Sequence, residues 1–130
     1  GIEVIIDFPE KDNIEWNMRE ADTIALLSNI FDNSIEGAAK CENGHIRVRL
    51  EWDNMVKLTV SNSKPCSLLY EGVMRSGKMI RTSKHDFREH GFGLSVINEI
   101  VDRYAGDMEF VDLGKEFYLC VELSALLLKL

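Results

Sequence analysis

Apolar and polar residues alternate in several short stretches of the chain, which is the pattern of half-buried β-strands. HIRVRLEW (45–52) alternates without a break, and MVKLTVSN (55–62) follows it across a turn at Asp53-Asn54. The two stretches predict a β-hairpin with one face buried. β-Branched and aromatic content indicates three further strands, at 2–8, 107–112 and 117–123.

A period of 3.6 residues marks two longer stretches as helices. The first runs from about Met18 to Cys41, and the second from near Gly91 to Gly106. One face of the second helix carries Leu94, Ile97, Val101 and Tyr104. The order of these elements predicts an α+β fold, a two-layer sandwich with helices on one face of a mainly antiparallel sheet.

The segment from about 63 to 90 follows neither period. A loop of this length inside a compact domain is typically a lid or a binding loop. Five basic residues fall in one part of it, against the single acid Asp86: Arg75, Lys78, Arg81, Lys84 and Arg88. This local cluster could hold a compact polyanion, although the chain as a whole is acidic.

Bulk composition narrows the function classes. A net charge of -7 argues against broad binding to nucleic acid or to an anionic membrane surface. Three widely spaced cysteines without a CxxC signal neither a disulfide framework nor a zinc site, and favour a reducing cytoplasm. We expect one domain spanning 1–130. Because the chain starts at Gly1 without a methionine or signal peptide, we expect it to be cut from a longer protein.

The first helix carries two asparagines, which are mediocre helix formers, near its centre. On a helical wheel they belong to a polar stripe about 40° wide, formed by Asn29, Asn33, Glu36 and Lys40, with Asp32 alongside. On the opposite side we expect an apolar stripe packed on the sheet: Ile24, Leu27, Phe31, Ile35 and Ala38. The asparagine stripe is either an ordinary solvated face or a set of amide oxygens that bind metal or phosphate.

Two further motifs carry candidate chemistry. In HGFGLSVI (90–97), Gly91 and Gly93 lead into a helix whose first amides could bind an anion. A lone GxG motif is weak evidence for phosphate binding, but the basic segment directly before it could supply cations to the same phosphates. In LTVSNSKP (58–65), a strand ends at Asn62, which is either a recognition residue or a turn-starting asparagine.

Taken in this order and spacing, the three motifs resemble the N, G1 and G2 boxes of the GHKL ATP-binding superfamily. NIFDNSIEGA (29–38) is similar to the N box, and TSKHDFREHGFGLSVINEIVDRYAG (82–106) is similar to the lid end and G2 box of AgrC-like and NatK-like bacterial sensor kinases. The resemblance covers nearly the whole chain and implies a Bergerat-type ATP-binding sandwich with an ATP lid.

The resemblance implies roles for the asparagines. Asn33 is similar to the family's Mg²⁺-coordinating residue, and Asn29 touches phosphate or metal one turn earlier. Asn62 stands where most members have an adenine-reading aspartate; its oxygen can accept from the adenine amino group, without the charge. The glycine-rich motif after it is degenerate, because Lys64 replaces the first glycine.

The resemblance also implies a set of phosphate and lid contacts. The phosphate loop is formed by His90, Gly91, Phe92, Gly93 and Leu94, and the lid cations are Lys84, Arg81 and Arg88. Hydrolysing members of the family have a glutamate where this chain has Asn29. We therefore expect ATP to be held with little turnover.

The activity that this implies is that of a histidine kinase in two-component signalling, with ATP and Mg²⁺ as cofactors. The γ-phosphate would pass to a histidine on a separate dimerisation domain, and then to a response regulator. None of His45, His85 and His90 is a convincing acceptor. We expect a monomeric cytoplasmic fragment of a dimeric membrane sensor, with no membrane or nucleic-acid contact of its own. Two alternatives stay open: a stand-alone ATPase or serine kinase, and a pseudokinase interaction module without nucleotide.

Overall fold

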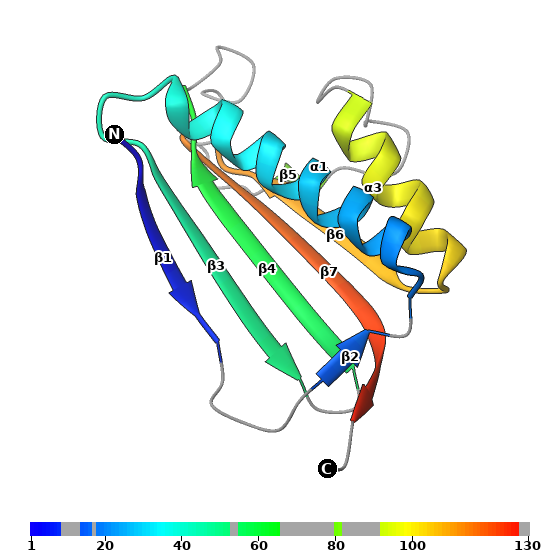
Figure 1. Cartoon of the computed structure of the whole chain (residues 1–130). Helices are drawn as coiled ribbons and strands as arrows, with labels where there is room; N and C mark the ends of the chain where they lie inside the picture. The colour runs from blue at the N-terminus through cyan, green and yellow to red at the C-terminus, as the bar shows by residue number, and fades with distance from the viewer. Residues whose placement is uncertain (9–13, 17, 53–54, 66–79, 82–91, 128–130) are drawn as a thin grey trace.

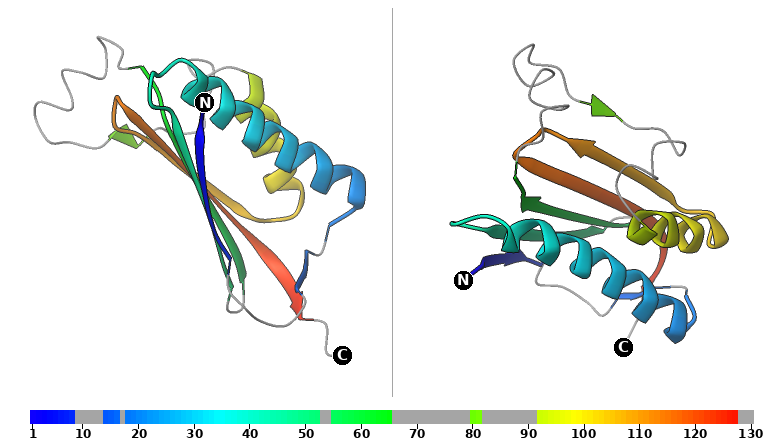
Figure 2. Two further views of the ribbon diagram at one scale, coloured as in Figure 1. Left: turned by 60° about the vertical axis from the view of Figure 1, so that its left-hand side comes forward. Right: turned by 90° about the horizontal axis from the view of Figure 1, so that it is seen from above.

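The computed structural model describes residues 1–8, 14–16, 18–52, 55–65, 80–81 and 92–127. Within these ranges two helices lie side by side on one face of a seven-stranded sheet, and the other face carries no described helix (Figures 1 and 2). The elements are β1 (Glu3–Asp7), β2 (Ile14–Trp16), α1 (Glu20–Ala39), β3 (His45–Trp52), β4 (Met55–Ser63), β5 (Ile80–Arg81), α3 (Phe92–Arg103), β6 (Asp107–Asp112) and β7 (Glu116–Leu127).

The strand order is β1-β3-β4-β7-β6-β5, and β2 pairs with the far end of β7. Among the described strands only β1 and β3 run parallel, as expected for two strands joined by a crossover that contains helix α1. All the other pairs are antiparallel. The two-layer α+β sandwich predicted from the order of elements is therefore confirmed.

The predicted hairpin is present, and its register decides where polar groups meet. In the β3–β4 pair, Asn62 lies opposite Ile46, and in the β4–β7 pair it lies opposite Phe117. Burial alternates along β3 as the sequence requires, with Ile46 and Val48 buried and Arg47 and Arg49 exposed. At its end β4 departs from alternation, because Ser61, Asn62 and Ser63 are all buried. Three consecutive buried polar residues at a strand end indicate a special environment.

The apolar stripe predicted for α1 was wrong by part of a turn. Ala38 is buried as expected, and Leu27 and Phe31 pack against the edge of the core. Ile24 and Ile35, however, are 58% and 49% exposed. The residues that face the sheet are instead Leu26, Ile30, Ser34 and Ala38. This rotation brings the asparagine stripe to the border of the core rather than opposite to it.

Two short strands were missed by the sequence pattern. β2 lies between the strand predicted at 2–8 and the first predicted helix, and β5 lies inside the predicted lid. Strands of three and two residues are too short to show a period. In addition, Ser63 belongs to β4, so the predicted lid cannot begin there. The second helix, by contrast, has the predicted face, with Leu94, Ile97 and Val101 fully buried.

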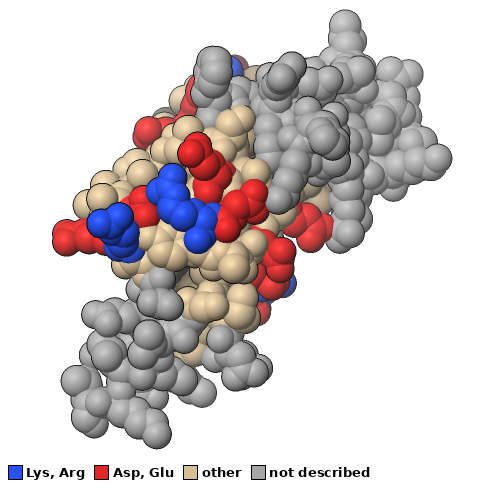
Figure 3. Space-filling model, turned by 90° about the vertical axis from the view of Figure 1, so that its right-hand side faces the viewer, with Lys and Arg blue, Asp and Glu red and all other residues tan. Residues whose placement is uncertain are grey.

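A polar cluster joins the first turn of α1 to the last turn of α3. Asp22 accepts hydrogen bonds from the Tyr104 hydroxyl and, at 2.9 Å, from the Arg103 guanidinium. The Arg19 backbone N–H donates to the same hydroxyl at 3.1 Å. Figure 3 shows this face of the molecule, where acidic and basic side chains are interspersed in the described region. No described helix is both long and apolar enough to cross a membrane.

Candidate functional site

A pocket of about 370 Å³ opens where the last turns of α1 meet the end of β4 and the start of β7. This volume is in the range of small-molecule sites. The first turn of α3 lies at the same end of the molecule (Figure 1). The pocket is lined by Asn33, Glu36, Gly37, Lys40, Asn62, Lys64, Pro65 and Phe117.

Asn62 forms the buried wall of the pocket. Its side chain is only 2% exposed, and its amide nitrogen donates to the Ser63 carbonyl at 3.0 Å. The amide oxygen is buried, and within the part of the chain that the structure describes it has no hydrogen-bond partner. Because a buried acceptor without a donor is costly, this atom marks a position where a ligand donor would be stabilising.

Gly37 lets the helix approach Asn62 closely. A Cβ placed on Gly37 would lie 2.4 Å from the Asn62 amide nitrogen and 3.3 Å from the Ser63 carbonyl oxygen. No side chain fits at that separation without moving the amide. Gly37 was not among the residues predicted for the site, although a glycine in the last turn of a helix, directly after Glu36 of the polar stripe, was the available signal.

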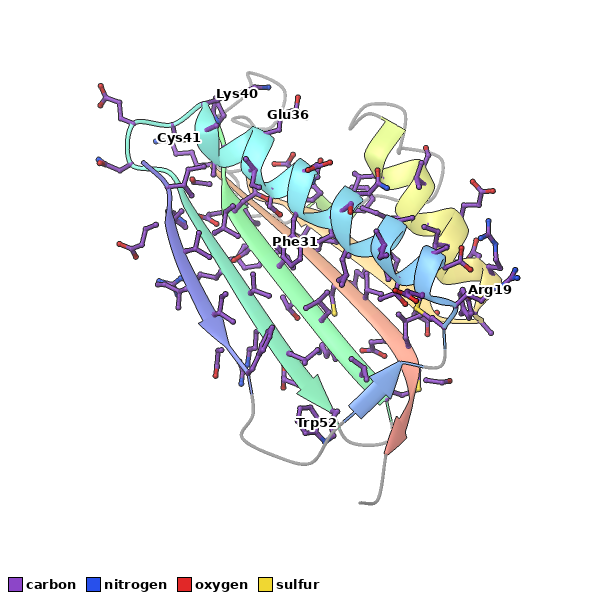
Figure 4. All side chains as sticks on the ribbon, in the orientation of Figure 1. Arg19, Phe31, Glu36, Lys40, Cys41 and Trp52 are labelled. Atoms are coloured by element: carbon purple, nitrogen blue, oxygen red, sulfur yellow. The ribbon has the colours of Figure 1, made fainter. Side chains whose placement is uncertain are left out.

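The polar stripe of α1 leads into the pocket. Asn33, Glu36 and Lys40 line it, and Figure 4 shows Glu36 and Lys40 projecting from the last turns of the helix. Glu36 and Lys40 form an ion pair at 3.8 Å, and both are exposed. No hydrogen bond joins the Asn33 side chain to another described residue. Asn29 lies one turn earlier and donates from its amide nitrogen to the Ala25 carbonyl at 2.7 Å.

Lys64, which replaces the family's glycine, is held against the wall of the pocket. Its ammonium donates to the Gly114 carbonyl at 2.9 Å and lies 3.2 Å from the Asp112 carboxylate. The same carboxylate accepts from the Gly114 N–H at 2.8 Å. Gly114 has a φ of 88°, which favours glycine at this turn. The lysine therefore ties the end of β4 to the β6–β7 turn.

A second polar contact lies beside this wall. The Ser63 hydroxyl accepts from the His45 backbone N–H at 2.9 Å and donates to the His45 carbonyl at 3.4 Å. The His45 ring bonds the Glu116 carboxylate. The His45 side chain is thereby engaged with β7.

The predicted phosphate and lid residues are only partly described. Gly93 lies in the first turn of α3, and no described atom lies within 4 Å of a Cβ placed on it. The Leu94 side chain is fully buried in the core, so only its main chain is left to meet a ligand. For Phe92 and Arg81 the backbone alone is described, in α3 and β5. The remaining predicted contacts lie outside the described residues: Lys84, Arg88, His90 and Gly91.

The donor set indicates what kind of metal could be held. The described residues contain no group of three or more histidine, cysteine, aspartate or glutamate side chains that could bind a metal by themselves. A Mg²⁺ ion usually takes one or two protein ligands and completes its shell with phosphate oxygens and water. The Asn33 amide at the pocket wall fits that limited role.

Comparison with protein families gives the wider context. Residues 18–124 match the GHKL domain family along their whole length. The chain belongs to the GHKL domain family. This agrees with the resemblance of the three boxes, whereas the AgrC-like and NatK-like branch is a finer distinction that the family match does not make. No curated protein sequence matches this GHKL domain.

Solved catalytic domains of histidine kinases share the fold. The catalytic domain of histidine kinase ThkA superposes with a TM-score of 0.64 and 23% identity, over 95% of this chain and 79% of that chain. The mycobacterial sensor histidine kinase MprB superposes with a TM-score of 0.67 and 14% identity, over 98% of this chain and 84% of that chain. Full-length ShkA, solved in complex with AMPPNP, gives 0.67 and 15% over 100% of this chain and 27% of its own. At these identities the likeness shows the fold.

Proposed function

We propose that this GHKL domain binds Mg-ATP and presents the γ-phosphate to a histidine on a separate dimerisation domain. The observation that carries the proposal is the buried Asn62 oxygen, which lacks a donor among the described residues and forms the wall of a pocket. The adenine 6-amino group would supply that donor. The ion pair of Lys64 with Asp112 supports an intact pocket wall despite the degenerate glycine motif.

The phosphate end of the site would form between α1 and α3. Asn33 would bind Mg²⁺ through its amide oxygen, and the ion would neutralise charge on the phosphate oxygens when bound. The N-terminal amides of α3, beginning at Phe92 and Gly93, would face the phosphates with the helix dipole behind them. Three basic residues of the lid segment would add cations: Arg81, Lys84 and Arg88.

Asn29 determines what becomes of the nucleotide. An amide has no usable basicity, so this helix offers no group to activate water at the position where hydrolysing members carry glutamate. Phosphoryl transfer depends mainly on positioning and charge neutralisation, and an external nucleophile can complete it. We infer that a histidine of the parent protein's dimerisation domain supplies that nucleophile. A response regulator would then receive the phosphoryl group. The lid-end sequence favours a membrane-bound sensor of the AgrC-like or NatK-like branch.

A thermal-shift titration tests the proposal. We expect Mg-ATP to raise the melting temperature of the wild type, because a ligand that binds only the folded state stabilises it. Asn33→Ala should lose most of this shift. Asn98→Ala is the matched control, since Asn98 is a helical asparagine on α3 that contacts Asp102 and does not line the pocket. An equal shift in both variants would contradict the role of Asn33.

The two alternatives predict different outcomes in the same protein. A stand-alone ATPase would release phosphate from Mg-ATP at a steady rate without any partner domain. A nucleotide-free interaction module would show no thermal shift at millimolar Mg-ATP. The proposal predicts a shift with little turnover.

A further inference from the structure

We propose that Gly37 is a positioning residue that fixes the Asn62 amide as a hydrogen-bond acceptor, so that the pocket selects 6-amino over 6-oxo purine nucleotides. This inference rests on the proposed nucleotide binding and adds to it a specificity determinant on α1. Because glycine has no side chain, the role of Gly37 is steric: it leaves space for a neighbouring group.

The first part of the argument is steric. A Cβ at Gly37 would come within 2.4 Å of the Asn62 amide nitrogen, a separation that real Cβ atoms do not adopt. Because the nearest atom is the tip of a side chain, the amide rather than the backbone would move. Asn62 is only 2% exposed and has little room to move into, so its oxygen would turn away from its present position.

The second part fixes which end of the amide faces the pocket. The Ser63 carbonyl oxygen lies 3.0 Å from the Asn62 amide nitrogen. Rotating the amide by half a turn would bring two oxygen atoms together at that distance, without a proton between them. The amide nitrogen must therefore face Ser63, and the oxygen is left to face the ligand as an acceptor. Asn62 in this setting acts as the aspartate of the family would, although its amide could in principle donate.

The third part is the chemistry of the base. The 6-amino group of adenine donates to an acceptor, whereas the 6-oxo group of hypoxanthine would meet the Asn62 oxygen with another oxygen. A site built around one buried polar group discriminates strongly against a ligand that leaves it unpaired. If Asn62 were free to rotate, it could donate to the 6-oxo group and the discrimination would shrink. The Ser63 carbonyl opposes that rotation, and the absence of a Cβ at Gly37 leaves the amide the space to keep this contact.

Gly37 has no other evident reason to be glycine. It lies within α1, and the described residues with left-handed φ are Ala105 and Gly114. Alanine is the better helix former at a helical position, so a glycine here weakens the helix. The close approach to Asn62 explains its presence.

The experiment measures the affinity of the domain for Mg-ATP and Mg-ITP by calorimetry. It compares the wild type with Gly37→Ala, Asn62→Ala and the double variant. Ser28→Ala is the matched control, because this exposed position on α1 also gains helix propensity without lining the pocket. We expect the wild type and the control to prefer ATP by at least ~10-fold, the effect of one well-placed hydrogen bond and an avoided oxygen contact.

Gly37→Ala should reduce the preference for ATP to roughly 3-fold or less. In the Asn62→Ala background the added methyl has no amide to displace, so the double variant should bind like Asn62→Ala alone and melt at a higher temperature. A Gly37→Ala protein that keeps the wild-type ratio of affinities would overturn the inference while leaving nucleotide binding intact. A wild type that binds neither nucleotide would overturn the proposed function instead.

Discussion

The two ends of helix α1 treat the polar groups packed against them in opposite ways. In the first turn, Asp22 receives hydrogen bonds from Arg103, the last residue of α3, and from Tyr104, which follows it. Near the last turn, the buried Asn62 oxygen beside Gly37 has no donor among the described residues. Both ends bring a strongly polar group against the helix, but only one of them satisfies it from within the chain.

The difference separates a structural contact from a binding site. A carboxylate with its donors in place stabilises the fold and leaves nothing for a ligand to add. An acceptor left without a donor lowers stability until a ligand supplies one, so it couples binding to folding. Sequence features alone do not reveal this difference, since both ends of α1 carry acidic residues.

The largest expected effect breaks the contact that ties the pocket wall together. Lys64→Ala removes the ammonium that lies 3.2 Å from the fully buried Asp112 carboxylate, and removing one partner of a buried ion pair is strongly destabilising. We expect a loss of about 3 kcal/mol in the free energy of unfolding by urea denaturation. Lys57→Ala, which truncates an exposed lysine on β4, should cost less than about 0.5 kcal/mol. Equal losses in the two variants would refute the structural role of Lys64.

The next largest effect is a loss of stability expected at the first turn of α1. Asp22→Ala removes the acceptor of two charge-assisted hydrogen bonds, and we expect a loss of about 2 kcal/mol in the free energy of unfolding. The affinity for Mg-ATP should stay within about twofold of the wild type, because the cluster lies at the other end of the helix. Glu20→Ala in the same exposed first turn serves as the control for removing an acidic side chain. A large loss of affinity in Asp22→Ala would contradict the division between the two ends.

The third effect is a loss of nucleotide affinity expected at the pocket beside the last turn of α1. Asn62→Ala removes the acceptor, and we expect the affinity for Mg-ATP to fall about 10-fold, or about 1.4 kcal/mol. Its loss of stability without nucleotide should be smaller than that of Asp22→Ala, because the oxygen that disappears had no donor among the described residues. Asp22→Ala should thus lose more stability, and Asn62→Ala more affinity. Calorimetry and urea unfolding of the two variants, measured in parallel, check this contrast. An Asn62→Ala protein that loses stability and keeps its affinity for Mg-ATP would contradict it.

Much of the fold was predictable because periodicity reports burial directly. The β3–β4 hairpin and the buried face of α3 follow from patterns with periods of two and 3.6 residues. These patterns predicted the α+β sandwich that the structure confirms. The sheet-facing side of α1 was predicted wrongly, by part of a turn, since Ile24 and Ile35 are exposed while Ser34 is buried. A helix with apolar residues on several sides does not specify which of them packs against the sheet.

The site was predictable only as a set of residue types. Asn33 and Asn62 were selected from their motifs, and the structure brings both to one pocket. Gly37 was not selected, because the glycine is visible in the sequence whereas the short distance between α1 and Asn62 of β4 is not. The same holds for Lys64: the resemblance places a glycine there and so indicated a degenerate motif, whereas the structure shows that Lys64 contacts Asp112 and Gly114.

Calorimetric titration of the wild-type domain with Mg-ATP tests the central claim most directly. The account predicts saturable one-to-one binding, with ITP bound more weakly under the same conditions. The absence of binding heat at millimolar Mg-ATP would contradict it.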